Sequence, residues 1–200
     1  RMVGDIDFIF SKEDYPKAIS VLKENGYSEV KKKEYYPPDD KKHYRRLQKE
    51  NNIAAIEIHS EFSYNRKYNK KFNYSFVKKD SQVVNFVTVL SYANKLNLSI
   101  IGYQINDFGF NFKTIALRNA YDVFLLSKKT NAKDAMISLG KLSHPLNCFL
   151  AACYDIFNKL DTLEYYNTTK LVSYLSVINN QYNNSIRAKR RRSEEHTSEL

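Results

Sequence analysis

The first 26 residues and the stretch after them alternate between strand-like and helix-like patterns of apolar and polar positions. Residues 5–10 and 27–36 have the pattern of strands, in which successive side chains point to opposite faces. Residues 14–25 predict a helix, because their apolar side chains recur at three- and four-residue spacing. Gly26 supplies the left-handed residue that commonly ends a helix. The chain therefore begins as strand, helix, strand.

A hairpin is expected next. Residues 43–49 and 53–62 both have strand character, and Asn51 and Asn52 between them form a turn pair that tolerates positive φ. The following segment, 63–73, is polar and rich in Tyr, Asn and Lys, so we expect it to be a loop.

Beyond residue 82 the apolar positions recur at helical spacing. Helices are predicted over residues 83–96, 112–127, 132–142, 145–160 and 168–182. Together the two halves predict an α+β fold, in which a small mixed β-sheet with a flanking helix is followed by a helical region.

Both ends of the sequence have unusual features. Arg1 leads directly into the first predicted strand, so we expect a further segment upstream. Residues 192–200 resemble the translation of a sequencing-library adapter, and they are left out of the fold prediction. We expect residues 187–200 as a whole to form a disordered tail.

The charge of the chain is strongly basic. Lys and Arg number 32 against 22 Asp and Glu, which gives a formal net charge of +10. Such a positive field favours nucleic acid or nucleotide phosphates as partners. An AT-rich coding sequence explains the same balance, because Lys (23) far outnumbers Arg (9). Charge alone leaves both interpretations open.

Two further classes of protein are not favoured. The chain has two cysteines, Cys148 and Cys153, which are too few and too close together for a disulfide framework or a zinc site. It also lacks the apolar run of about eighteen residues that a membrane span needs. We therefore expect a cytoplasmic protein without a membrane partner.

The candidate chemistry lies in three carboxylates. Asp5 and Asp7 share one face of the first strand, while Ile6 and Phe8 share the other. In a later strand Glu57 lies on the same face as His59. Three carboxylates on neighbouring strands are the donor set that holds divalent cations in phosphoryl transfer. Strand order decides whether the three meet.

These residues carry a resemblance to a known family. The pattern resembles the uncharacterised nucleotidyltransferase family of the polymerase-beta-like superfamily over residues 1 to about 165, most closely over 1–62. The matching features are Arg1-x-x-Gly4-Asp5-Ile6-Asp7-Phe8-Ile9, Gly26-Tyr27, His43, Ile56-Glu57-Ile58-His59 and Leu117-Arg118-x-x-x-Asp122-Val123.

The resemblance implies a nucleotidyltransferase that moves an NMP from an NTP to a hydroxyl group of an unknown protein, RNA or small-molecule acceptor. It implies that Asp5, Asp7 and Glu57 are catalytic and bind Mg²⁺ or Mn²⁺. Four further residues are implied to bind substrate, namely Arg1, Gly4, His43 and His59. The glycine-rich element that the superfamily carries before the first aspartate is not found here, so we expect these 200 residues to bind nucleotide weakly or to be inactive.

On this resemblance the chain divides into three parts. Residues 1–66 are expected to form a partial catalytic core, residues 67–186 a mainly helical region, and residues 187–200 the tail.

Two other functions remain open. A basic module that binds nucleic acid without catalysis predicts binding that depends steeply on salt and not on Asp5 or Asp7. A degenerate member of the family that acts as an interaction partner predicts that Glu57 is turned away or paired internally.

Overall fold

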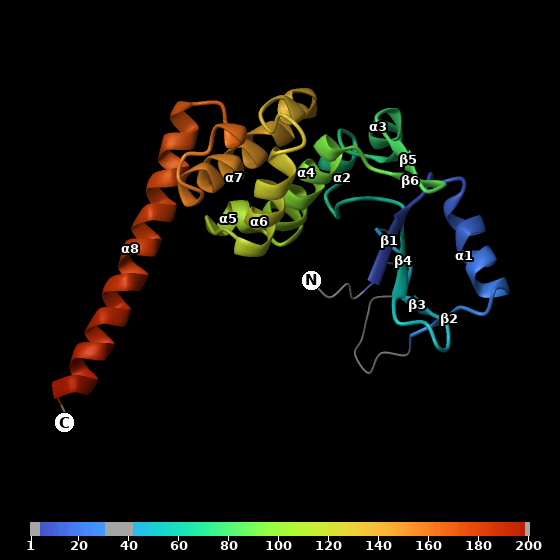
Figure 1. Ribbon diagram of the computed structural model, residues 1–200, viewed down its shortest axis with the longest axis horizontal. Coiled ribbons are helices and arrows are strands. Elements are labelled where there is room, and N and C mark those ends of the chain that lie inside the picture. Colours follow the sequence, from blue (N-terminus) through green and yellow to red (C-terminus); the bar gives the residue numbers. More distant parts are fainter. Residues whose placement is uncertain (1–4, 31–41, 199–200) are drawn as a thin grey trace. The chain divides into compact units, whose positions relative to one another are not determined.

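A computed structural model describes residues 5–30 and 42–198, with side chains up to residue 184. The chain divides into two compact units, Arg1–Ser91 and Tyr92–Leu200, which are described separately (Figure 1). Every strand in the described residues lies in the first unit and the second is helical, so the predicted α+β class is confirmed.

The first unit is built on a four-stranded sheet in the order β1-β4-β3-β2. β1 (Asp5–Ile9) pairs in parallel with β4 (Ala55–His59). β3 (Leu47–Gln48) pairs antiparallel with both β4 and β2 (Ser28–Glu29). The parallel pair brings two segments that are distant in sequence side by side.

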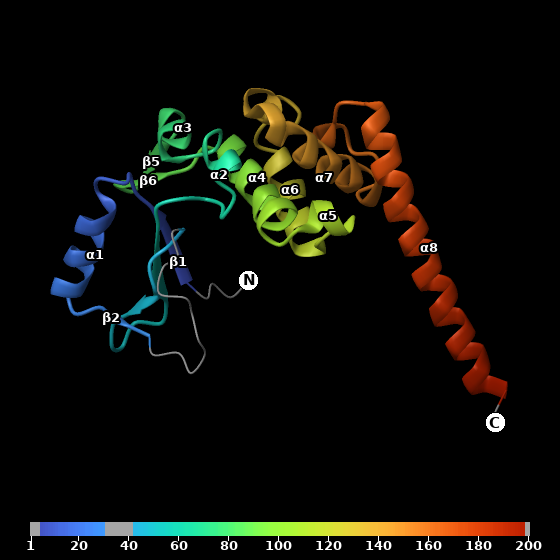
Figure 2. The ribbon, with the colours of Figure 1, turned by 180° about the vertical axis from the view of Figure 1, so that it is seen from behind.

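Helix α1 (Tyr15–Glu24) covers one face of this sheet, as both views show (Figures 1 and 2). Leu47, Ile56 and Ile58 are buried on that face. The apolar side of α1 packs against them through Ala18, Ile19 and Leu22. Since side chains alternate along a strand, the polar residues of β4 are directed to the opposite face.

The predicted hairpin around Asn51 is present in shortened form. Leu47 pairs with Ile56, and Asn51 has a φ of 66°, which matches the positive φ expected of this turn. The strand predicted over 27–36 is observed only at Ser28–Glu29; residues 31–36 lie outside the described residues.

Two short helices follow β4. Residues 63–73, expected to be a loop, contain α2 (Arg66–Asn69), whose first turn is capped by the Asn65 side chain accepting from the Lys67 amide. Helix α3 (Tyr74–Lys79) begins after Asn73, which caps it in the same way.

The helix predicted from residue 83 to residue 96 is wrong in its first half. β5 (Gln82–Val84) and β6 (Val87–Val89) form an antiparallel hairpin there. Asn85 and Phe86 between them both have positive φ, as a two-residue turn requires. The helix itself begins only at residue 92.

The second unit is made of helices, of which α7 is the most buried. Cys148, Phe149 and Leu150 of this helix are fully buried. The main helices are α4 (Tyr92–Ile101), α6 (Leu117–Ser127), α7 (Ser143–Ile156) and α8 (Thr169–Ser198). Shorter pieces are a π-helical turn (Gly102–Asn106), α5 (Gly109–Phe112) and 3₁₀ segments at Asp134–Leu142 and Asp161–Leu163.

Several boundaries in this unit differ from the predicted ones. The helix expected over 112–127 starts at Leu117, because Lys113 adopts a left-handed φ of 55° and ends α5. The helix expected over 145–160 covers Ser143–Ile156 instead. α8 continues to Ser198 through the segment that the sequence predicts to be a disordered tail.

The division into units also differs from the one drawn from sequence. α2, α3 and the β5–β6 hairpin belong to the first unit, which ends at Ser91, whereas the sequence assigns residues from 67 onward to a helical region.

Among the described residues, no helix combines the length and the apolar character that crossing a membrane requires.

Candidate functional site

The parallel register of β1 and β4 places the acidic residues opposite one another. Asp7 pairs with Glu57, and Ile9 pairs with His59. Because paired residues of a parallel ladder share a face, Asp7, Glu57 and His59 all project from the side of the sheet that α1 does not cover. The strand order therefore brings the predicted carboxylates of β1 and β4 together.

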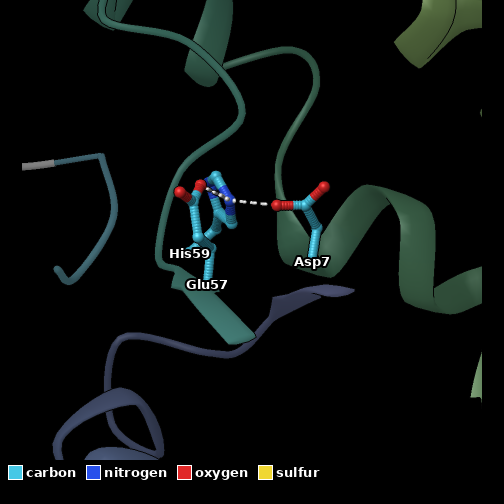
Figure 3. Close-up of side chains that lie close together, drawn as sticks. All are labelled: Asp7, Glu57 and His59. Atoms are coloured by element: carbon cyan, nitrogen blue, oxygen red, sulfur yellow. Dashed lines mark hydrogen bonds and ion pairs between the residues drawn. The ribbon is translucent and has the colours of Figure 1, made fainter. Parts of the chain in front are cut away.

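His59 is the centre of this group (Figure 3). Its Nε2 donates a hydrogen bond of 2.9 Å to Asp7 Oδ1 and lies 3.7 Å from Glu57 Oε2. One ligand atom from each of the three residues lies within 4.8 Å of those from the other two. In the described part of the chain, no other set of three such side chains meets this condition.

Burial and charge differ among the three side chains. Those of Glu57 and His59 are 19% and 15% exposed, whereas that of Asp7 is 65% exposed. The hydrogen bond from His59 lowers the pKa of Asp7 below its ordinary value and outweighs the opposing effect of burial. Asp7 is therefore a charged carboxylate at neutral pH, open to an approaching ligand.

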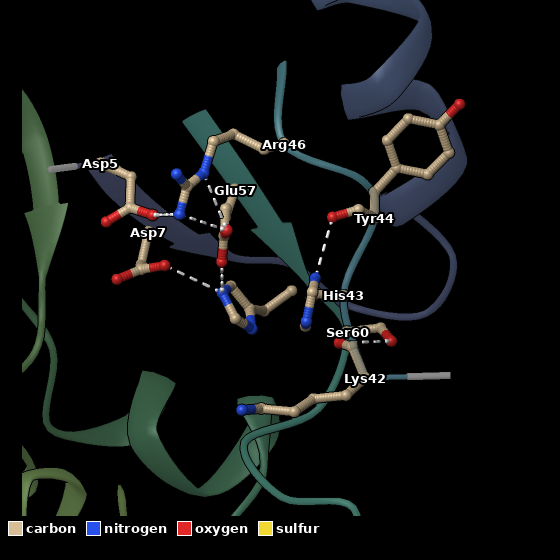
Figure 4. A network of polar contacts seen from close by, with 9 residues as sticks. Asp5, Asp7, Lys42, His43, Tyr44, Arg46, Glu57 and Ser60 are labelled. Atoms are coloured by element: carbon tan, nitrogen blue, oxygen red, sulfur yellow. Dashed lines mark hydrogen bonds and ion pairs between the residues drawn. The ribbon is translucent and has the colours of Figure 1, made fainter. Parts of the chain in front are cut away.

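Asp5 has a different partner (Figure 4). Arg46, which precedes β3, donates from Nη2 to Asp5 Oδ2 at 2.5 Å and from Nε to Glu57 Oε1 at 3.2 Å. Burial opposes the charge on the guanidinium, but the two carboxylates outweigh it and raise the pKa of Arg46. Asp5 thus shares the face of the predicted set, yet it is joined to Glu57 through an arginine.

The implied substrate-binding residues fall into two groups. The His43 ring lies 5.1 Å from the His59 ring, and its Nδ1 donates to the Tyr44 carbonyl at 3.0 Å. His43 is therefore at the site but outside the three-residue group. Arg1 and Gly4 lie outside the described residues.

The sequence pattern did not single out Arg46 as a residue of the site. A signal was present in the hairpin. Leu47 pairs with Ile56, so the residues next to them, Arg46 and Glu57, are brought close on adjacent strands with opposite charges.

The donor set fits a divalent cation. Two carboxylates offer the oxygen ligands that Mg²⁺ and Mn²⁺ prefer, and the His59 nitrogen is a donor that Mn²⁺ also accepts. Asp5 offers a further carboxylate on the same face once its ion pair with Arg46 is broken. A cation bound by these residues would neutralise the negative charge of phosphate groups, as phosphoryl and nucleotidyl transfer require.

Comparison with known proteins gives one result. No curated protein and no solved structure matches the chain significantly. A family model described as an uncharacterised nucleotidyltransferase matches residues 1–156, more than three quarters of the sequence and every residue of the candidate site. The chain belongs to this uncharacterised nucleotidyltransferase family.

Proposed function

We propose that the protein transfers an NMP from an NTP to a hydroxyl acceptor, with a divalent cation bound by Asp7, Glu57 and His59. The observation that supports this most strongly is the convergence of two carboxylates and an imidazole from two parallel strands, in a chain of nucleotidyltransferase family. Mg²⁺ and Mn²⁺ are the proposed cations, and the NTP is the proposed donor.

The proposed reaction breaks one phosphorus–oxygen bond and forms another. The acceptor oxygen attacks the α-phosphorus, the bond from that phosphorus to the bridging oxygen breaks, and pyrophosphate leaves. When bound, the cation neutralises phosphate charge and favours an in-line arrangement of the attacking and leaving oxygens. Glu57, as one carboxylate of the group, would take up the proton of the acceptor hydroxyl.

The other residues of the site hold these groups in place. Without a cation, His59 Nε2 donates its proton to Asp7 Oδ1 over 2.9 Å and so keeps the two side chains together. That nitrogen would give up its proton on binding the cation. Until a cation binds, Arg46 holds Glu57 through Nε. Since His59 lies in β4 and Arg46 directly precedes β3, the carboxylates are held in place before any ligand arrives.

The direct test is transfer of label from α-³²P-labelled NTPs, each of the four supplied with Mg²⁺ or Mn²⁺ and with RNA, protein or small-molecule acceptors. Asp7→Asn and Glu57→Gln are expected to abolish labelling and to weaken Mn²⁺ binding at least tenfold. Glu50→Gln, an exposed acid in the turn before β4, is the matched control.

Unchanged Mn²⁺ and nucleotide binding in both site variants contradicts the proposal. Tight, salt-sensitive RNA binding that survives in both variants indicates instead a basic module without catalysis.

A further inference from the structure

A cavity of about 840 Å³ opens at the carboxyl ends of β1 and β4. Its walls come from the β1–α1 loop, from Lys42, from the loop after β4 and from α2 and α3. This volume lies within the range of about 300–1,000 Å³ that is usual for small-molecule sites. The cavity lies wholly within the first unit.

The cavity lies directly beside the group of Asp7, Glu57 and His59. Ser60, which lines it, directly follows His59. The Ser60 amide donates to the Lys42 carbonyl at 2.9 Å, so the backbone of Lys42 is held against the end of β4. From there the Lys42 side chain extends, in the view of Figure 4, beneath His43 towards the side on which Asp7 lies, and its positive charge helps to lower the pKa of Asp7. Lys42 therefore lines the cavity and also acts on the group of Asp7, Glu57 and His59.

Four cationic and two acidic side chains line the cavity. One of the two acidic side chains has a partner for each of its carboxylate oxygens. Glu61 Oε1 pairs with Lys12 at 3.1 Å, and its Oε2 accepts from Asn69 Nδ2 at 2.7 Å. Neither Arg66 nor Lys70 forms an ion pair with another residue in the described ranges 5–30 and 42–184. The unbalanced charge of the cavity is therefore positive.

The wall that carries Arg66 and Lys70 is firmly held. Asn69, between them, is buried; its Oδ1 accepts from the Ser63 amide at 3.0 Å, which ties α2 to the loop after β4. Beneath this loop the rings of Phe62 and Phe72 pack with centroids 4.8 Å apart. A fixed wall holds its cations in place at a smaller entropic cost than a mobile one.

We infer that this cavity binds the phosphate groups of a substrate of the adjacent centre, through Lys42, Arg66 and Lys70. The role of the cavity in the reaction rests on the proposed function. Phosphate binding itself rests on the cavity alone. Two sources carry this chemistry: the triphosphate of the NTP with its pyrophosphate product, and a phosphate on the acceptor.

The test is calorimetric titration of the whole chain with inorganic tripolyphosphate in the presence of EDTA, so that binding does not depend on a cation. Arg66→Glu with Lys70→Glu is expected to weaken binding at least tenfold. Lys67→Glu with Lys71→Glu is the matched control, because it makes the same change of charge at the neighbouring positions, which do not line the cavity. The control is expected to stay within threefold of the unmodified chain.

Equal weakening in both double variants, or none in either, overturns the inference, since the effect would then come from net charge or not exist. Circular dichroism of both variants checks that α2 and its surroundings still fold; if the cavity variant is unfolded, Arg66→Gln with Lys70→Gln replaces it with the same expectation.

A second titration distinguishes the two sources. If saturating non-hydrolysable NTP displaces tripolyphosphate, the cavity holds the nucleotide phosphates; if both bind together, it holds the acceptor phosphate. Asp7→Asn with Glu57→Gln is expected to retain tripolyphosphate binding in EDTA, so failure of the proposed function and failure of the cavity give different results.

Discussion

His59 Nε2 lies 2.9 Å from Asp7 Oδ1, joining residues 52 positions apart across the parallel β1–β4 pair. Neither residue reaches the other without this register, because a shift by one position would turn one of the two side chains to the α1 face. The contact therefore ties the candidate chemistry to the topology of the sheet.

We predict that His59→Asn lowers the affinity for Mn²⁺ by about 10- to 100-fold, because it removes a ligand and frees the Asp7 carboxylate to rotate. Electron paramagnetic resonance titration of free Mn²⁺ measures this directly. His43→Asn is the comparison, since that ring lies 5.1 Å from His59 but outside the three-residue group. An equal loss in both variants would contradict the assignment of His59 as a ligand.

Arg46 is predicted to compete with the cation. Its guanidinium occupies the space between Asp5 and Glu57, so Arg46→Met leaves these two like charges without the cationic group between them. We expect the free energy of unfolding without metal to fall by about 1 kcal/mol, a modest value because the Arg46 side chain is 39% exposed. Mn²⁺ affinity is expected to rise about fivefold.

Urea unfolding with and without Mn²⁺ checks both effects of Arg46→Met. Arg45→Met is the matched control, because the neighbouring arginine pairs with Glu29 and not with the site. Weaker Mn²⁺ binding in Arg46→Met would show that Arg46 supports the cation instead of competing with it.

The sheet edge contains a pH-sensitive cluster around Glu29. Its carboxylate accepts hydrogen bonds from the Tyr44 hydroxyl, from Lys23 Nζ at 3.1 Å and from Arg45 Nη1 at 3.1 Å. The Tyr44 bond, followed by the Lys23 bond, lowers the pKa of Glu29. Since the folded pKa lies below the unfolded one, Glu29 contributes stability above about pH 4.3 and loses it as the pH falls through the folded pKa.

We therefore predict that Glu29→Gln reduces the loss of unfolding free energy between pH 7 and pH 3. The difference is expected to stay below about 1 kcal/mol because the cluster is partly exposed to solvent. Urea unfolding of both proteins at the two pH values measures it. An identical pH dependence in the variant would show that the cluster is not coupled to folding.

The two cysteines are predicted to be unreactive in the folded protein. Burial raises the pKa of Cys148 to about 12, and burial also raises the pKa of Cys153 well above its ordinary value. The thiolate is the reactive form, so at pH 8 labelling by a thiol reagent is expected to be at least about 100-fold slower than in urea-unfolded protein. Rapid labelling of the folded chain at both positions would contradict the packing of α7.

The sequence was most informative where its pattern reports directly on strand faces. Alternation alone put Asp5 with Asp7 and Glu57 with His59, and the parallel pairing then made these two faces one. The sequence could not reveal that the Arg46 side chain lies between Asp5 and Glu57, because this position depends on the register of β3 against β4.

The hairpin of residues 82–89 shows why the sequence misled elsewhere. Val83, Phe86, Val87 and Leu90 are spaced as on a helix, and this spacing predicts one. In the structure Val83 is 73% exposed and Phe86 is fully exposed, so the pattern marks no buried helix face. The β-branched Val and Thr residues were the better signal.

The most direct test of the central claim is the anomalous scattering of Mn²⁺ in crystals of this protein soaked with MnCl₂ and a non-hydrolysable NTP. We predict an anomalous peak bonded to Asp7, Glu57 and His59, with the nucleotide phosphates beside it. A nucleotide bound elsewhere in the chain, with no Mn²⁺ at these three side chains, would contradict it.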